Sequence, residues 1–156
     1  MKVYQLIRKQ HLPITLEQAW SFFSTPANLE KLTPSDMKFN ILYNSGLNEM
    51  YAGQIITYKI KVPPGINMDW TTEITHVEPQ KYIVDEQRFG PYKMWHHEHR
   101  FTETEEGVMM EDIVNYVMPF GFIGRMAHIV FVKRQLSNIF DYRIKSIKDY
   151  IDNELS

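Results

Sequence analysis

The chain has 156 residues, of which 44% are hydrophobic and 23% are charged, and its formal net charge at neutral pH is -2. This length and composition predict one globular domain spanning residues 1–156. The small net charge gives no bulk electrostatic attraction to nucleic acid or to an anionic membrane. Cysteine is absent, which excludes disulfide bonds and a thiol nucleophile.

Targeting signals and the common catalytic motifs are also missing from the sequence. The first ten residues contain no unbroken apolar core, and no run approaches the roughly 18 apolar residues of a membrane span. A cytoplasmic protein is therefore the expectation. The sequence has no glycine-rich phosphate loop, Gly-x-Ser-x-Gly elbow or His-Glu-x-x-His helix, which disfavours nucleotide enzymes, serine hydrolases and zincins.

The N-terminal elements are predicted from alternation and from helix-capping signals. Residues 2–12 alternate loosely between apolar and polar and predict a strand. Thr15 and Gln18 have the spacing of a capping box at the start of a short helix. Thr25-Pro26 predicts the start of a second short helix, which Thr33-Pro34 ends.

The middle of the chain predicts a strand meander, and the C-terminal part predicts one long helix. The expected strands cover residues 39–43, 55–62, 68–79, 82–89, 95–101 and 108–118, with breaks that include Pro63-Pro64-Gly65 and a tight loop at 104–107. A helix over about residues 122–153 is predicted by apolar residues at three- and four-residue steps. These are Met126, Ile129, Val132, Leu136, Ile139, Phe140, Ile147 and Tyr150.

The segment around residues 95–101 has an unusual alternation. Trp95, His97, His99 and Phe101 share one face of an extended strand and alternate with polar or charged residues. Aromatic rings and imidazoles together are an odd lining for a packed core. They suit the wall of a cavity that is mostly apolar and has a few polar groups.

Landmarks along nearly the whole chain occur in an order known from one group of proteins. They are Pro13, Ala19-Trp20, Phe23, Pro26, Leu29, Leu32-Thr33-Pro34, Asp85, Gln87, Gly90-Pro91, Trp95, His97, His99, Phe101, Asp112, Tyr116, Pro119, Gly121 and Arg143. In this order the chain resembles the START-like, Bet v 1-like (SRPBCC) superfamily, and within it the polyketide cyclase/dehydrase-like ligand-binding proteins.

The resemblance implies an α+β helix-grip fold. About seven antiparallel strands would form a curved sheet around a long C-terminal helix, with two short helices between the first two strands and an apolar cavity inside. The superfamily includes lipid carriers, hormone receptors, aromatases and cyclases, so the fold does not choose a function.

The loop at residues 104–107 sets an expected register for the last hairpin. If this loop has four residues, Glu103 lies opposite Val108, and His99 lies opposite Asp112 on the same face. The same register pairs Phe101 with Met110, His97 with Val114 and Trp95 with Tyr116. A carboxylate beside an imidazole fixes its tautomer and favours its charged form. His99 and Asp112 are therefore either a general acid/base pair or a buried structural pair.

Asp85 and Gln87 are candidates for the same inward face. A three-residue loop at 90–92 would set Asp85 against His97 and Gln87 against Trp95. A two-residue loop would turn their sequence neighbours inward instead. The family resemblance favours the three-residue loop, and the residues alone leave both open.

Two further residue patterns carry open alternatives. His97 and His99 have the His-x-His spacing of a strand-borne metal site, with Asp112 or Asp85 as an acidic ligand, but no spacing fixes a third ligand. We therefore expect neither a metal nor another cofactor. Arg143 lies on the apolar stripe of the last helix, where it would extend to solvent, pair with a buried acid or grip a ligand carboxylate.

The favoured function is binding of a hydrophobic small molecule, such as a lipid, a polyketide-like compound or an aromatic compound, between sheet and helix. Asp85, Gln87 and Arg143 are further candidates, and His97, His99 and Asp112 would orient the polar end of the ligand. The expected wall consists of Trp70, Trp95, Tyr116, Met118, Phe120, Ile129 and Leu136.

Two other functions are kept as alternatives. One is a cyclase- or dehydratase-type enzyme that uses His99 and Asp112 as acid/base on a carbonyl-rich substrate. The other is an interaction module, which predicts an exposed apolar patch near Phe120 and Phe122 and no sizeable cavity. The sequence specifies neither the ligand nor the oligomeric state, and it predicts no nucleic-acid partner and no membrane span.

Overall fold

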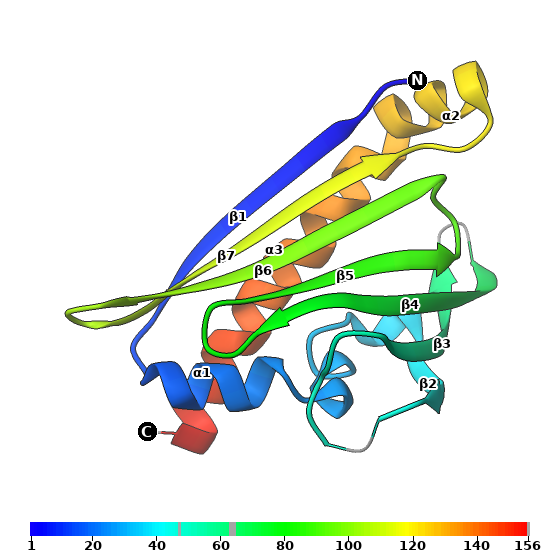
Figure 1. Cartoon of the computed structure of the whole chain (residues 1–156). Coiled ribbons are helices and arrows are strands. Elements are labelled where there is room, and N and C mark those ends of the chain that lie inside the picture. Colours follow the sequence, from blue (N-terminus) through cyan, green and yellow to red (C-terminus); the bar gives the residue numbers. More distant parts are fainter. Residues whose placement is uncertain (47, 63–64, 156) are drawn as a thin grey trace.

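A computed structural model describes residues 1–46, 48–62 and 65–155, so the expected break at Pro63-Pro64 lies outside the described residues. Across this part of the chain, seven antiparallel strands form one curved sheet in the order β1-β7-β6-β5-β4-β3-β2. A long helical segment lies against one face of the sheet (Figure 1). The strands are β1 Tyr4–Leu12, β2 Asn40–Asn44, β3 Gln54–Val62, β4 Ile66–Glu78, β5 Tyr82–Phe89, β6 Met94–Thr104 and β7 Gly107–Val117.

The strand order follows from one long crossover and a simple meander. After β1 the chain passes through helix α1 (Leu16–Phe23) and two 3₁₀ turns, η1 (Pro26–Leu29) and η2 (Ser35–Met37), to the opposite edge of the sheet. From β2 it returns strand by strand until β7 pairs with β1. The expected helix-grip architecture, including the short helical elements between the first two strands, is confirmed.

Local capping explains the shape of the crossover. The Thr15 hydroxyl accepts the Gln18 amide at 3.2 Å, and Gln18 Oε1 accepts the Thr15 amide at 2.9 Å, so the predicted capping box is present at α1. The second predicted helix is only a 3₁₀ turn. Thr25 donates its hydroxyl to the Ser21 carbonyl at 2.8 Å instead of capping the segment that begins at Pro26.

The C-terminal helical segment is continuous from Gly121 to Leu155 but is not a uniform α-helix. It consists of α2 (Gly121–Ala127), a π-helical turn η3 (His128–Val132), α3 (Lys133–Tyr150) and a second π-helical turn η4 (Ile151–Leu155). Within the described part of the chain, no helix combines the length and the apolar character needed to cross a bilayer.

The π-helical turn corrects the predicted apolar stripe. A π turn takes in more residues than an α turn, so it changes which side chains face the sheet on its two sides. His128 is buried, while Ile129 is 71% exposed. Met126 is also exposed, whereas Val132, Leu136, Phe140 and Ile147 are buried as the periodicity predicts.

Polar residues separate two apolar clusters of the described interior. One cluster packs α1 and the end of α3 against the sheet and includes Phe101, Met110 and Ile147. The other includes Trp95, Val114, Tyr116, Leu136 and Phe140. On each of β6, β7 and α3, buried polar residues lie between members of the two clusters, namely His97 and His99 on β6, Asp112 on β7 and Arg143 on α3.

The turn between β6 and β7 generates the first prediction. Gly107 has a φ of +138°, and a Cβ there would lie 2.2 Å from the backbone oxygen of Leu12. Gly53 also has a positive φ of +94°, but no described atom lies within 4 Å of its Cβ position. Gly107→Ala is therefore expected to lower the free energy of unfolding by about 1–3 kcal/mol more than Gly53→Ala does. Denaturant unfolding of both variants measures this difference, and equal losses would contradict it.

Candidate functional site

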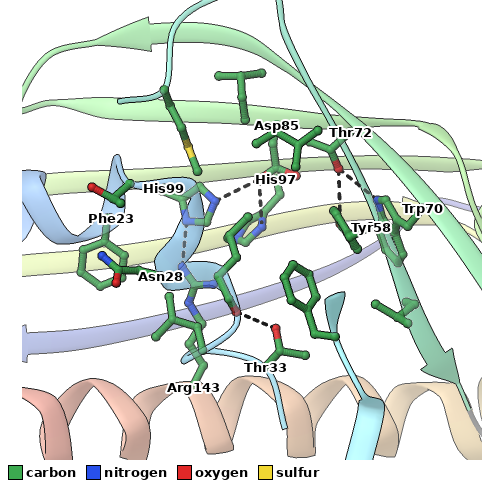
Figure 2. A pocket seen from close by; sticks show the side chains of 18 of the residues that line it. Phe23, Asn28, Thr33, Tyr58, Trp70, Thr72, Asp85, His97, His99 and Arg143 are labelled. Carbon is green, nitrogen blue, oxygen red and sulfur yellow. Dashed lines mark hydrogen bonds and ion pairs between the residues drawn. The ribbon is translucent and has the colours of Figure 1, made fainter. Parts of the chain in front are cut away.

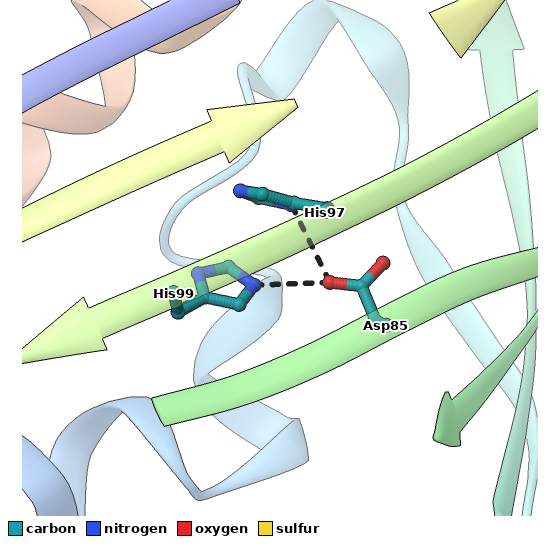
Figure 3. A group of neighbouring side chains, drawn as sticks. All are labelled: Asp85, His97 and His99. Atoms are coloured by element: carbon teal, nitrogen blue, oxygen red, sulfur yellow. Dashed lines mark hydrogen bonds and ion pairs between the residues drawn. The ribbon is translucent and has the colours of Figure 1, made fainter. Parts of the chain in front are cut away.

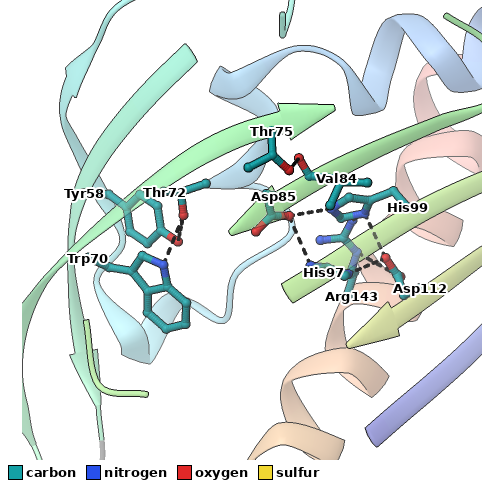
Figure 4. A network of polar contacts seen from close by, with 10 residues as sticks. All are labelled: Tyr58, Trp70, Thr72, Thr75, Val84, Asp85, His97, His99, Asp112 and Arg143. Carbon is teal, nitrogen blue, oxygen red and sulfur yellow. Dashed lines mark hydrogen bonds and ion pairs between the residues drawn. The ribbon is translucent and has the colours of Figure 1, made fainter. Parts of the chain in front are cut away.

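A buried charged cluster joins three neighbouring strands and the long helix. It consists of Asp85 on β5, His97 and His99 on β6, Asp112 on β7 and Arg143 on α3 (Figure 4). The strand register produces it, since Asp85 pairs with His97 and His99 pairs with Asp112. The predicted register of the last hairpin and the predicted placement of Asp85 opposite His97 are both confirmed.

Each carboxylate in the cluster contacts both imidazole rings. His97 Nε2 lies 2.9 Å from Asp112 Oδ1, and His99 Nε2 lies 3.0 Å from Asp85 Oδ2. The other ring nitrogens complete the arrangement: His97 Nδ1 lies 3.4 Å from Asp85 Oδ2, and His99 Nδ1 lies 2.9 Å from Asp112 Oδ1. The four side chains therefore form a closed ring of contacts rather than one isolated pair.

Arg143 closes the cluster from the helix side. Its Nε lies 3.4 Å from Asp112 Oδ2, and its Nη2 lies 3.2 Å from His99 Nδ1. Of the three roles left open by the sequence, the structure shows pairing with a buried acid. With one of the two imidazoles protonated, that imidazolium and Arg143 balance the charges of Asp85 and Asp112. This balance matters because an uncompensated buried charge is strongly destabilising.

The electrostatics of the cluster favour its charged form. Burial alone would lower the pKa of His97, but the negative charges of Asp85 and Asp112 and their hydrogen bonds raise it above its ordinary 6.5. Burial would raise the pKa of Asp112, yet the charge of Arg143 and hydrogen bonds from both histidines hold it well below its ordinary 3.8. The pKa of Asp85 is lowered in the same way by His97 and His99 against the effect of burial.

Asp85, His97 and His99 also have the composition of a metal site. Each offers one ligand atom, and these atoms lie within 4.8 Å of one another (Figure 3). In the observed arrangement, however, the ring nitrogens that would bind a metal face Asp85, and the guanidinium Nη2 of Arg143 lies 3.2 Å from the far nitrogen of His99. A nearby positive charge opposes a dication. The geometry is that of an ion-pair cluster.

The charged cluster forms one wall of a cavity of about 150 Å³ (Figure 2). Most of the remaining wall is apolar and comes from the sheet, α1, the 3₁₀ turns and α3. The lining residues are Phe22, Phe23, Thr25, Asn28, Leu29, Leu32, Thr33, Met37, Phe39, Met50, Ile56, Tyr58, Ile60, Trp70, Thr72, Ile74, Asp85, Trp95, His97, His99, Phe140 and Arg143.

A second polar group lines the cavity on β3 and β4. The Thr72 hydroxyl accepts from Trp70 Nε1 at 3.1 Å and lies 3.3 Å from the Tyr58 hydroxyl. Burial raises the pKa of Tyr58 far above its usual range, and the charge of Asp85 adds to this, while the hydrogen bond with Thr72 opposes it. Tyr58 therefore remains a neutral phenol that can donate or accept a hydrogen bond.

The cavity brings together part of the predicted ligand-binding set. Asp112 is not a lining residue, because it lies behind the two imidazoles and the guanidinium that it contacts. The predicted residues that do line the cavity are Trp70, Asp85, Trp95, His97, His99 and Arg143.

The other predicted site residues lie elsewhere, and their expected places are corrected. The Gln87 side chain bonds both backbone groups of Tyr92 and so holds the β5–β6 turn. Tyr116 is buried but pairs with His128, its hydroxyl 2.8 Å from Nε2. Met118 and Leu136 pack in the second apolar cluster. Phe120 and Ile129 are largely exposed, because α2 extends past the strand ends (Figure 1).

Several lining residues are not among those that the sequence predicts as site residues. Thr72 shares the strand parity of Trp70, and Tyr58 shares that of Ile56, so alternation alone was a usable signal for both. Phe23 lies on the buried face of helix α1. The residues after α1 in the crossover, such as Asn28, Thr33 and Met37, gave no such signal, because periodicity does not place 3₁₀ turns and loops against a sheet.

Removing one carboxylate tests how far the cluster depends on its charge balance. Asp112→Asn leaves Arg143 and protonated His97 under-compensated, so we expect the free energy of unfolding to fall by roughly 3–5 kcal/mol. The exposed Asp149→Asn on the same helix as Arg143 is the matched control and should change it by less than about 0.5 kcal/mol. Chemical denaturation of both variants measures the two free energies of unfolding. A similarly small loss in both would contradict the charge-balance argument.

The pKa shifts also predict how stability depends on pH. The folded pKa of His97 lies above its ordinary 6.5, so its stabilising effect is complete below that value and is lost as pH rises through the folded pKa. The effects of Asp85 and Asp112 are present above their ordinary 3.8 and are lost as pH falls through the lowered folded values. The free energy of unfolding, measured as a function of pH, should therefore decline below pH 3.8 and again above pH 6.5. The decline above pH 6.5 should be weaker in His97→Gln, and an identical decline would contradict its assignment.

Comparison with known proteins supports the fold alone. No family model and no curated protein sequence matches the chain. The solved structure of TTHA0849 from Thermus thermophilus matches with a TM-score of 0.72 and 13% identity over 98% of this chain and 100% of that one. Protein NE0264 from Nitrosomonas europaea matches with a TM-score of 0.70 and 13% identity over 96% and 95%.

A third solved structure is the di-domain ARO/CYC StfQ from the steffimycin biosynthetic pathway. It matches with a TM-score of 0.72 and 13% identity over 98% of this chain and 52% of StfQ. One domain-sized half of StfQ thus has the architecture of the whole chain described above. The chain has the helix-grip fold that the sequence predicts.

Proposed function

We propose that the protein binds a small hydrophobic molecule with one anionic or strongly polar end in the cavity between the sheet and α3. The observation that carries this proposal is the asymmetry of the cavity wall. Aromatic and aliphatic side chains form most of it, while Asp85, His97, His99 and Arg143 form a single charged side. A mostly apolar pocket with few convergent polar groups is the usual form of a small-molecule site.

The cavity volume limits the size of the bound group. A dry apolar cavity of about 150 Å³ accommodates one benzene molecule in an engineered protein. The cavity here has a volume of about 150 Å³. Sites for drug-sized ligands are larger, at about 300–1,000 Å³. The proposed ligand therefore inserts one ring or a short acyl group, and any larger part extends outside the cavity.

Arg143 supplies the preference for an anionic end. Its guanidinium lines the cavity, and its contacts within the cluster are made by Nε and Nη2 rather than by Nη1. Charge-assisted hydrogen bonds to a carboxylate are stronger than neutral ones. The hydroxyls of Tyr58 and Thr72 provide a second, neutral polar contact toward β3 and β4.

An acid/base role for His99 and Asp112 in a cyclase- or dehydratase-type reaction is less well supported. The ARO/CYC likeness favours it, but at 13% identity that likeness concerns the fold. All four imidazole nitrogens lie within 3.4 Å of another member of the cluster, and Asp112 does not reach the cavity. A substrate would first have to displace these contacts.

A matched pair of ligands tests the binding proposal without altering the protein. Benzoate is expected to bind at least about tenfold more tightly than benzyl alcohol, because only its carboxylate can form an ion pair with the Arg143 guanidinium. Isothermal titration calorimetry gives both dissociation constants. Equal affinities would remove Arg143 from the proposal, and the absence of binding by either ligand at millimolar concentration would remove the single-ring site.

A cavity-filling variant locates the binding. Met37 lines the cavity from a half-buried position, so Met37→Trp should fill part of it and abolish benzoate binding without unfolding the protein. Leu42→Trp on the exposed edge strand is the control and should bind like the original chain. Binding that survives Met37→Trp would place the ligand elsewhere.

A further inference from the structure

The end of the molecule at α2 carries a continuous set of exposed apolar side chains that the cavity does not use. Phe120, Ile123, Ile129 and Val130 are each more than two-thirds exposed, at 81%, 73%, 71% and 72%. Figure 1 shows α2 projecting beyond the strand ends, beside the N-terminus. We call this set the apolar tip. Its members are Phe120, Phe122, Ile123, Met126, Ile129, Val130 and Phe131.

The apolar tip covers two consecutive parts of the helical segment. Phe122 and Met126 lie four residues apart on α2, and Ile129 and Val130 follow in the π-helical turn. Soluble monomers rarely expose contiguous apolar patches of this kind without a binding role. The patch is the one that the interaction-module alternative anticipates near Phe120 and Phe122.

The segment that carries the apolar tip has only positive charges, although Asp36 of the crossover lines a groove together with Val130, Phe131 and Arg134. Residues 113–140 contain no Asp or Glu but include Arg125, Lys133 and Arg134. In the described ranges none of these three cations forms an ion pair. Lys2 lies on the same side and lines a shallow groove together with Lys133 and Ile129.

Burial and the positive charges of Lys133 and Lys2 lower the pKa of His128 beneath this surface. This shift agrees with a locally positive potential at the tip. The net charge of -2 for the whole chain therefore conceals a basic, apolar end.

These features favour an anionic lipid surface over other occupants. A symmetric contact with a second copy would bring Arg125, Lys133 and Arg134 near the same cations, with no carboxylate in residues 113–140 to neutralise them. A projecting helical end fits a bilayer interface, which deforms around it, better than it fits a preformed groove. Aromatic and aliphatic side chains flanked by Lys and Arg are the composition of interfacial helices.

We propose that the apolar tip docks the protein on anionic membranes, with Phe122, Ile123 and Val130 entering the acyl boundary and Lys133 and Arg134 contacting lipid headgroups. The proposal is independent of the cavity ligand, because none of these residues lines the cavity.

Vesicle co-sedimentation of the full chain tests this docking. Vesicles of 70% phosphatidylcholine and 30% phosphatidylglycerol should bind the protein at about 0.1 M salt, whereas pure phosphatidylcholine vesicles should bind it weakly. Raising the salt concentration to about 1 M should remove most of the difference, because screening then acts within about 3 Å. Equal binding to both vesicle types, or no binding to the anionic vesicles, would overturn the proposal.

Charge-matched variants identify the contacts. Lys133→Gln with Arg134→Gln should lower the partition coefficient on anionic vesicles about thirtyfold, since each basic residue near such a surface contributes about fivefold. Lys145→Gln with Lys148→Gln removes two exposed cations near the other end of α3 and should have little effect. If the two pairs give equal losses, binding follows net charge and the tip is not the docking surface.

Apolar variants separate membrane insertion from self-association. Phe122→Ser with Ile123→Ser should abolish vesicle binding at unchanged thermal stability, because both side chains are exposed. Leu42→Ser with Tyr43→Ser removes two exposed apolar residues from β2 and is the control. Analytical ultracentrifugation of the original chain is run in parallel. The original chain could prove to be a dimer that dissociates on the first pair of substitutions but not on the control pair. That result would show that a second copy covers the apolar tip, and the membrane proposal would be wrong.

Discussion

Charge balance in the interior is the constraint on which this structure depends. His97, His99, Asp112 and Arg143 are buried and Asp85 is half-buried, yet each is ionised or in contact with an ionised partner. Burial opposes every one of these charges, and the charges persist only because their partners are held within hydrogen-bonding distance. The register of three strands and the position of α3 on the sheet must therefore be correct together.

The same cluster divides the interior and creates the proposed site. Phe101 and Met110 on one side and Trp95 and Val114 on the other pack in separate apolar clusters. Ionic side chains cannot fill the space between them as densely as aliphatic ones, because their geometry is set by hydrogen bonds rather than by contact. The cavity lies along this boundary, so the groups that organise the fold are also those that a guest molecule would contact.

The sequence predicts the fold and the polar half of the site well, for an identifiable physical reason. A tight loop at 104–107 with period-2 alternation fixes a register, and the register alone places His99 beside Asp112. Residues outside regular periodicity are harder to place. Gln87 bonds the Tyr92 backbone at a turn, and the crossover residues reach the cavity through 3₁₀ turns, which no repeat of two or 3.6 residues describes.

The π-helical turn His128–Val132 interrupts the periodicity from which the apolar stripe was predicted. It also sets which side of the helical segment faces the sheet before and after it. Such a turn is equivalent to one residue inserted into an α-helix. A chain shortened by one residue there would rotate everything before it by about 100° around the helix axis. His128 would then move from its buried position toward the exposed one that Ile129 has now. A single-residue insertion thus allows one helix to face the sheet along α3 and the surroundings along α2, without a break between two differently oriented surfaces.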